Sequence, residues 1–276
     1  MILYGRNPVM EALRGRRAHT VGEVWGTVGA AREPWLEGVA VRTATVEEIE
    51  GRCGSAAHQG ICARAGGYPY VSAEELLVRR DAGRPTAGES TDKPTAGGPT
   101  AVGQTAKGPS AGGSSAGGEA LIVALDQVQD PQNLGAICRT AECVGVTGVV
   151  IPERRSAEVT PAVCKASAGA VEHLRVARVR NLADFLAQAR DAGCWSYGAS
   201  AGGRSVPYDR PDYRGGVVLA LGSEGRGLRP RVASVCDELI ALPLLGRIES
   251  LGVSAAAAAI MYEILQNRRR ALDNAS

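Results

Sequence analysis

The sequence predicts an α/β protein with a small N-terminal domain and a larger C-terminal domain built on a mainly parallel sheet. After residue 119, short apolar runs alternate with helical patterns, which is typical of a parallel sheet with helices on both faces. Residues 1–80 form a shorter unit of the same kind. Between them, residues 81–118 are rich in Pro, Thr, Ala, Gly and Ser and almost free of large apolar side chains, which predicts a flexible linker. We therefore expect domains at 1–80 and 119–276 that can move relative to each other.

Composition narrows the class of protein. Of 276 residues, 45% are hydrophobic, and the net charge is only +2, so bulk charge does not indicate a nucleic-acid partner. The seven cysteines form no C-x-x-C pair, which argues against a zinc site or a disulfide framework and favours a reducing, cytoplasmic location. No apolar run approaches the roughly 20 residues of a membrane span, so we expect no membrane partner.

The N-terminal unit carries several local signals. Asn7 followed by Pro8 predicts a helix start, with Asn7 as N-cap. Thr45, followed by acidic residues, predicts a second helix. A strand is expected at 21–25 and another after His58. A single histidine beside a turn is more often structural than catalytic, and that interpretation is favoured for His58.

The C-terminal pattern is more regular. We expect strands at 121–125, 148–151, 174–179, 194–199, 217–221 and 239–242. We expect helices at 133–144, 159–168, 182–192 and 254–270. Ligands bind beyond the carboxyl ends of strands in open parallel sheets, so the loops after these strands are the place to look for chemistry.

The loop after the first of these strands lacks the G-x-G-x-x-G of a dinucleotide site. It carries Asn133 and, six residues later, Arg139, which we expect on one end and face of the same helix. An asparagine can orient a hydroxyl group, and an arginine can bind a phosphate bidentately. Taken alone, Asn133 would more often be a helix cap and Arg139 a surface salt-bridge partner.

Two later loops strengthen the case for a site. The apolar run at 217–221 leads into Gly222-Ser223-Glu224-Gly225-Arg226-Gly227, whose glycines allow backbone to approach a ligand closely. The run at 239–242 leads into a polar loop that contains Ser250. A generic nucleotide-binding module is a weaker interpretation, because the glycine spacing does not fit the expected fingerprint.

In order and spacing, these three loops resemble the three motifs of the SpoU (TrmH) family, the 2′-O-ribose RNA methyltransferases of the SPOUT superfamily. The segments 5–13 and 58–61 resemble that family's substrate-binding domain, most like the group that methylates a guanosine of 23S ribosomal RNA. The resemblance implies a trefoil knot that binds S-adenosylmethionine, an RNA substrate, no metal, and a homodimer.

The resemblance also implies site residues. Those expected to line the cofactor pocket are Gly222, Leu242 and Leu251. Those expected to be functional are Asn133, Arg139, Glu224 and Ser250, with Arg139 completing a site near the partner subunit's cofactor. Two residues depart from the family's pattern: Gly252 stands where the third motif usually has an asparagine, and Glu249 where the family often has a small polar residue.

Arginine is effectively always protonated, so we expect Arg139 to bind an RNA phosphate and stabilise a developing alkoxide. Glu224 and Asn133 would hold the arginine and the loop. The substrate alternatives are transfer RNA and a ribosomal RNA nucleotide connected with antibiotic resistance. The alternative from another class, motivated by Gly252, is an RNA-binding ribosome assembly factor with weak catalysis.

Overall fold

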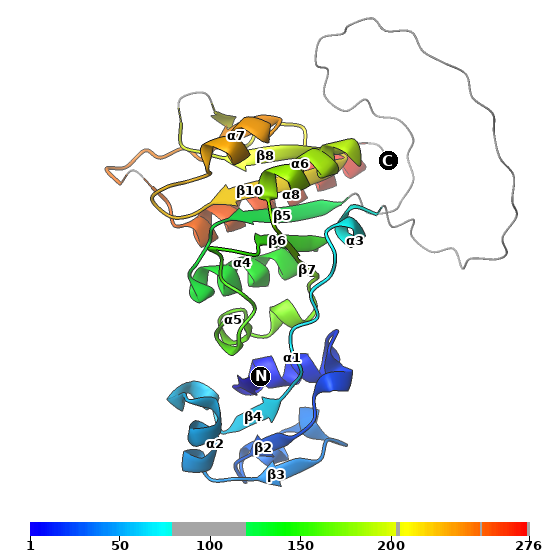
Figure 1. Cartoon of the computed structure of the whole chain (residues 1–276), viewed down its shortest axis with the longest axis vertical. Coiled ribbons are helices and arrows are strands. Elements are labelled where there is room, and N and C mark those ends of the chain that lie inside the picture. Colours follow the sequence, from blue (N-terminus) through cyan, green and yellow to red (C-terminus); the bar gives the residue numbers. More distant parts are fainter. Residues whose placement is uncertain (79–119, 203–204, 249, 275–276) are drawn as a thin grey trace, which may run out of the picture.

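The two predicted domains are stacked along the long axis of the protein in a computed structural model (Figure 1). The structure describes residues 1–78, 120–202, 205–248 and 250–274. The predicted linker at 81–118 lies outside these residues. Among the helices of these residues, none combines the length and the hydropathy that a membrane span requires.

The N-terminal domain is a four-stranded sheet in the order β1-β4-β2-β3, with a helix on either face. Its strands are β1 (Ile2–Tyr4), β2 (Val24–Gly26), β3 (Val41–Thr43) and β4 (Ile61–Arg64). Its helices are α1 (Arg6–Arg14) and α2 (Val46–Cys53), with short 3-10 turns η1 (Ala18–Thr20), η2 (Ala30–Arg32), η3 (Pro34–Leu36) and η4 (Ala56–His58). β2 pairs with β3 in parallel, and β4 pairs antiparallel with β1 and β2.

Some of the local predictions made for this domain are confirmed, and one is wrong. The predicted start of α2 is confirmed: Thr45 and Glu48 form a reciprocal capping box, and Ile49 packs into a small core with Trp25. The predicted N-cap of α1 is wrong, because the helix begins two residues earlier with Gly5 as N-cap. His58 is structural, as favoured. The residue is 4% exposed, and its Nδ1 accepts a 3.0 Å hydrogen bond from the backbone N–H of Gly60.

The C-terminal domain is a seven-stranded sheet in the order β7-β6-β5-β10-β8-β11-β9, and all of its described pairings are parallel. Its strands are β5 (Leu121–Asp126), β6 (Gly148–Pro152), β7 (Val176–Val179), β8 (Cys194–Ala199), β9 (Val206–Pro207), β10 (Gly216–Gly222) and β11 (Glu238–Ala241). Its helices are α3 (Glu74–Leu77), α4 (Pro131–Cys143), α5 (Pro161–Ala166), α6 (Leu182–Asp191), α7 (Pro230–Val235) and α8 (Val253–Asp273), with the turn η5 (Ala170–Glu172).

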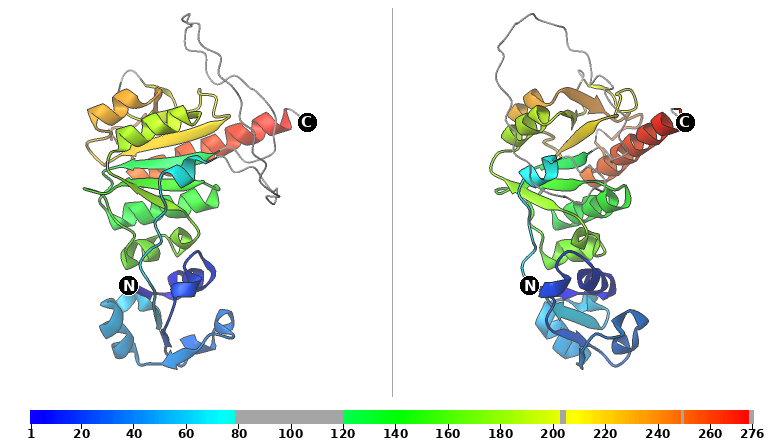
Figure 2. Two further views of the ribbon diagram at one scale, coloured as in Figure 1. Left: turned by 45° about the vertical axis from the view of Figure 1, so that its right-hand side comes forward. Right: turned by 90° about the vertical axis from the view of Figure 1, so that its right-hand side faces the viewer.

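Side chains of the central strands alternate between two cores. On β5, Leu121, Val123 and Leu125 join the cluster that α4 and α8 cover, whereas Ile122 and Ala124 join the cluster that α6 and α7 cover. Burial on both faces explains why the strand reads as an unbroken apolar run. The predicted parallel sheet with helices on both faces is therefore confirmed (Figure 2). The sequence prediction missed the two-residue strand β9 and the short helix α7.

The chain between the two domains follows an unexpected course. After β4 it runs up along the C-terminal domain, where the backbone N–H of Val71 bonds to the carbonyl of Val176 at 3.0 Å (Figure 1). Leu76 of α3 is fully buried in the core under α6. The linker therefore starts from the C-terminal domain and returns to it at β5. The connection between the two domains is therefore made before residue 71, so the segment 81–118 does not lie between them as expected from the sequence.

Candidate active site at the carboxyl edge of the parallel sheet

An ion pair between a buried carboxylate and a partly exposed arginine fixes the central strand ends. Asp126 and Gly222 are register partners at the ends of β5 and β10. Asp126 is fully buried, and its carboxylate accepts hydrogen bonds from the backbone N–H of Arg229 at 2.8 Å and from its Nε at 2.7 Å. A buried carboxylate must be paired in this way to be tolerated. The pair ties the far end of the glycine loop to the neighbouring strand.

The glycine loop after β10 is folded tightly on itself. Ser223 and Gly227 form a bridge, with a 2.8 Å hydrogen bond from the N–H of Gly227 to the carbonyl of Ser223. Gly225 and Gly227 have φ of +75° and +65°, which glycine adopts readily. A Cβ on Gly222 would lie 2.0 Å from the carbonyl carbon of Gly227. Only glycine fits at position 222 without moving the loop.

The loop after β5 turns into α4 through a cap that differs from the expected one. Asp130 is the N-cap and accepts hydrogen bonds from the backbone N–H groups of Gln132 and Asn133, and Pro131 occupies the first helical position. The simple interpretation of Asn133 as a helix cap is therefore wrong. Because Asp130 performs that role, the side chain of Asn133 is left for another partner.

Two adjoining cavities lie over these loops. One of about 370 Å³ is lined by the expected cofactor residues Gly222, Leu242 and Leu251, together with Ser250. The other, of about 300 Å³, is lined by Asn133 and a set of polar neighbours. Glu224 lines both. Six of the seven expected site residues thus gather around one pair of cavities.

Arg139 is the exception. It lines neither of these cavities, is exposed on α4, and forms no ion pair with any residue that the structure describes. Six residues on a regular helix with 3.6 residues per turn correspond to about 240° of rotation beyond a full turn. The expectation that Asn133 and Arg139 share one face of α4 is therefore wrong. Within a single chain, Arg139 stands apart from the cavities.

Gly252 faces Glu224. A Cβ at position 252 would lie 3.3 Å from Oε1 of Glu224, and the φ of Gly252 is −53°, which any residue adopts. Gly252 is also the N-cap of α8 and offers no side-chain hydrogen bond there. The departure from the family's asparagine therefore removes both a possible cap and a polar neighbour of the carboxylate.

The cysteine in the first loop motif, Cys138, has a structural role and is not a reactive group. Cys138 lies fully buried on α4 between residues of the core, and burial raises the pKa of its thiol to about 12. A thiol that stays protonated is a poor nucleophile. We conclude that Cys138 packs the helix against the sheet.

Sequence reasoning did not single out every residue of this edge. Asp126 is a charged residue at the end of an apolar run, and that contrast could have marked it. Nothing in the sequence links it to Arg229, 103 residues away. Further polar residues lining the smaller cavity are Gln127, Gln129, Ser223 and Arg226.

Comparison with known proteins agrees with this geometry. The profile of the SpoU rRNA methylase family matches residues 120–262, and the profile described as RNA 2′-O ribose methyltransferase substrate binding matches residues 2–71. This chain belongs to the SpoU rRNA methylase family. Among its relatives is the putative TrmH family tRNA/rRNA methyltransferase YacO of Bacillus subtilis, 32% identical over 96% of this chain and 94% of its own length. A TrmH family tRNA/rRNA methyltransferase of Staphylococcus haemolyticus is 30% identical over 100% of this chain and 99% of its length.

Solved structures share the fold. The SpoU methyltransferase AviRb of Streptomyces viridochromogenes, crystallised with AdoMet, has a TM-score of 0.71 at 21% identity, covering 97% of this chain and 90% of AviRb. A TrmH family RNA methyltransferase of Porphyromonas gingivalis has a TM-score of 0.63 at 25% identity, covering 95% of this chain and 88% of that protein. The predicted fold class and family are confirmed. The chain is an RNA methyltransferase, and the SpoU family uses S-adenosylmethionine as methyl donor.

Proposed function

We propose that this protein methylates the 2′-oxygen of a ribose in ribosomal RNA, at a guanosine of the 23S molecule, in the cytoplasm. The observation that carries the proposal is the pair of cavities that share Glu224. One is lined by glycine-rich backbone and apolar side chains, and the other by amide, hydroxyl and charged groups. Such a pair suits a cofactor and a ribose held side by side.

The larger cavity fits S-adenosylmethionine. Its wall at Gly222 is bare backbone that a Cβ would fill, and its floor includes Leu221, Ile240 and Ile260, which are buried beneath the loops. Backbone groups of the glycine loop and of the loop that carries Leu242 and Leu251 would hold the cofactor. When bound, it supplies an activated methyl group on a sulfonium.

The chain's own residues would then align a ribose and stabilise charge. A ribose hydroxyl becomes a nucleophile only as its proton leaves, so positioning and alkoxide stabilisation are the main needs. Asn133 is placed to orient the hydroxyl, because Asp130 has freed it from capping. Glu224 and Ser250 would fix the loops around the reacting atoms. Arg139 would bind the RNA phosphate and stabilise the alkoxide.

The position of Arg139 supports a homodimer. In one chain it stands outside both cavities, so a second copy must bring it to a site, as the family resemblance implies. The loop after β11 exposes a row of apolar side chains suited to such a contact. Their exposed fractions are 41% for Leu244, 97% for Leu245, 75% for Ile248 and 48% for Leu251.

We further propose that the C-terminal domain contains a trefoil knot. The strand order and the packing of α8 against α4 support this proposal.

The two domains would have different roles. The N-terminal domain, predicted at 1–80, would bind RNA, and residues 119–276 would carry the cofactor and the chemistry. We place residues 71–77 with the catalytic domain, because they pack there.

The proposal is tested by incubating the purified protein with labelled S-adenosylmethionine and unmodified 23S ribosomal RNA, 16S ribosomal RNA or bulk transfer RNA. The labelled RNA is digested to nucleosides and identified by mass spectrometry. We expect a 2′-O-methylguanosine from 23S RNA. Label on transfer RNA would show that transfer RNA, and not ribosomal RNA, is the substrate. Label on a base would contradict methylation of the ribose. RNA binding with no label in any RNA would favour the assembly factor.

A further inference from the structure

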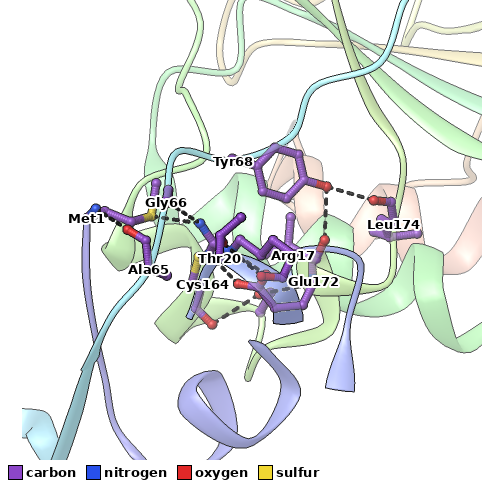
Figure 3. A network of polar contacts seen from close by, with 11 residues as sticks. Met1, Arg17, Thr20, Ala65, Gly66, Tyr68, Cys164, Glu172 and Leu174 are labelled. Carbon is purple, nitrogen blue, oxygen red and sulfur yellow. Dashed lines mark hydrogen bonds and ion pairs between the residues drawn. The ribbon is translucent and has the colours of Figure 1, made fainter. Parts of the chain in front are cut away.

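The two domains are joined by a pair of charges that takes no part in the proposed reaction. Arg17 follows α1 in the N-terminal domain, and Glu172 lies in η5 of the catalytic domain. Both side chains are 0% exposed. Their contact is bidentate, with Nε and Nη2 of Arg17 lying 2.7 and 2.5 Å from the two carboxylate oxygens (Figure 3).

Every N–H donor of the Arg17 guanidinium has a partner. Besides Glu172, the partners are the carbonyl of Gly66 at 3.2 Å, the sulfur of Met1 at 3.1 Å and the sulfur of Cys164 at 3.4 Å. Burial alone would lower the pKa of Arg17, but the hydrogen bonds and attraction to Glu172 outweigh it, and the pKa is raised. The guanidinium of Arg17 is therefore charged, and each of its N–H groups is satisfied.

Neighbouring contacts define the same orientation. The hydroxyl of Tyr68 donates toward the carbonyls of Val171 at 3.0 Å and Leu174 at 2.7 Å, on the same short stretch as Glu172 (Figure 3). The guanidinium of Arg16 donates to the carbonyl of Leu174 at 3.0 Å. Directional bonds of this kind admit one docked arrangement, whereas an apolar interface of the same size would tolerate sliding.

A fixed arrangement has a consequence for the substrate. Two binding surfaces held at one spacing reinforce each other only when the ligand presents its two elements at that spacing. A folded RNA does so without further ordering, whereas a short flexible strand reaches one surface at a time. The predicted linker at 81–118 does not relax this demand, because the described residues on either side of it, up to 78 and from 120, both pack with the catalytic domain.

We propose that Arg17 and Glu172 are positioning residues that lock the RNA-binding domain onto the catalytic domain, so that the enzyme selects a folded RNA over an unstructured strand containing the same target nucleotide. The proposal rests on the proposed function for its activity arm. Its structural arm, the docked orientation, does not depend on it.

Four proteins test the proposal. Arg17→Met leaves the carboxylate of Glu172 buried without a partner, and we expect a Tm lower by about 10 °C. In Arg17→Met/Glu172→Leu, neither charge remains, and we expect a Tm within a few degrees of wild type, because apolar replacement of a buried pair is often neutral. Glu11→Gln is the matched control. It weakens the 2.7 Å contact with His173 at the exposed edge of the same interface.

The first readout is the distance between spin labels on genetically encoded non-natural residues at the exposed positions 28 and 188, one in each domain. We expect one narrow distribution for wild type and Glu11→Gln and a broad one for the double variant. A narrow, unchanged distribution in the double variant would overturn the proposal, whether or not the protein methylates RNA.

The second readout is methylation of a folded RNA and of a short oligonucleotide with the same target. For the folded RNA we expect the double variant to raise KM about 10-fold, with the saturating rate and the affinity for S-adenosylmethionine unchanged. The oligonucleotide should be used equally by all folded variants. Unchanged discrimination, in a double variant whose distance distribution has broadened, would overturn the selection of folded RNA. If the wild type methylates neither RNA, the proposed function fails, and the distance measurement alone decides whether the pair locks the domains.

Discussion

Charged side chains serve opposite purposes at the domain joint and at the carboxyl edge of the sheet. At the joint, Arg17 and Glu172 are fully buried and satisfy each other within the fold. At the edge, Glu224 is exposed and forms no ion pair with any described residue. Arg139, farther along α4, is also exposed and forms no ion pair with the described residues. Charges whose partners lie inside the protein hold geometry, and charges without such partners are available to a ligand. The contrast separates positioning from chemistry along the length of one chain.

The largest effect at the carboxyl edge is expected from a substitution in the glycine loop, which should change cofactor binding and leave the domain joint intact. Gly222→Ala would place a Cβ 2.0 Å from the backbone of Gly227 and force the loop out of position. Overpacking of this kind costs about 3 kcal/mol. We therefore expect Gly222→Ala to bind S-adenosylmethionine about 100-fold more weakly than wild type, as measured by calorimetry.

The matched control for this prediction is Gly246→Ala, in the other cofactor loop. A Cβ there meets nothing within 4 Å. We expect its affinity to be near wild type. Equal affinity for both variants would show that the glycine loop does not form the cofactor wall.

Asp126 gives the next largest effect. Asp126→Ala removes the buried partner of Arg229 and frees one end of the glycine loop. We expect a loss of about 2–3 kcal/mol in the free energy of unfolding, measured by urea titration, because the remaining guanidinium is partly open to water. Asp184→Ala is the control. It breaks a surface pair with Arg231 whose side chains are 61% and 73% exposed, and should cost less than about 1 kcal/mol. Similar costs would contradict a special role for the pair of Asp126 and Arg229.

Shortening the predicted linker should change stability less than Asp126→Ala does. We expect deletion of residues 86–112 to change the free energy of unfolding by less than about 1 kcal/mol, from the shorter loop alone. The distance between labels on the two domains should not change, because both linker ends attach to the catalytic domain. A shift in that distance would mean that the linker helps to set the domain spacing.

Gly252 gives the smallest expected effect. Gly252→Asn would restore an N-cap to α8 and a polar neighbour for Glu224. We expect a gain of a few tenths of a kcal/mol in stability, read as a small rise in Tm. Gly246→Asn, in the same loop but away from a helix end, is the comparison and should give no gain. A fall in Tm specific to position 252 would show that the space beside Glu224 is needed empty.

Local signals in the sequence predicted much of this fold. The unbroken apolar run of β5 predicts a strand buried on both faces, and Thr45 with Glu48 predicts the start of α2. The three loops could be placed at one edge because parallel strands end together. These features depend on neighbours in sequence or on a rule of topology.

Pairings over long distances could not be predicted. Arg17 and Glu172 lie 155 residues apart, and either alone resembles an ordinary surface charge. The cap at Asp130, which frees Asn133, depends on where the backbone turns after β5. The docking of Leu76 on the catalytic sheet was hidden because residues 1–80 read as one unit.

The separation of positioning from chemistry is tested most directly by single-turnover methylation at saturating RNA, with affinity for S-adenosylmethionine measured separately. Loss of a preorganised charge contact predicts that Arg139→Ala slows the saturating rate by about 10²- to 10³-fold without changing cofactor affinity. Arg139→Lys should also be slow, because an ammonium lacks the guanidinium fork. The Arg17→Met/Glu172→Leu protein should keep the wild-type saturating rate. Near-wild-type turnover by Arg139→Ala, or a collapse of the saturating rate in the folded joint variant, would contradict the account.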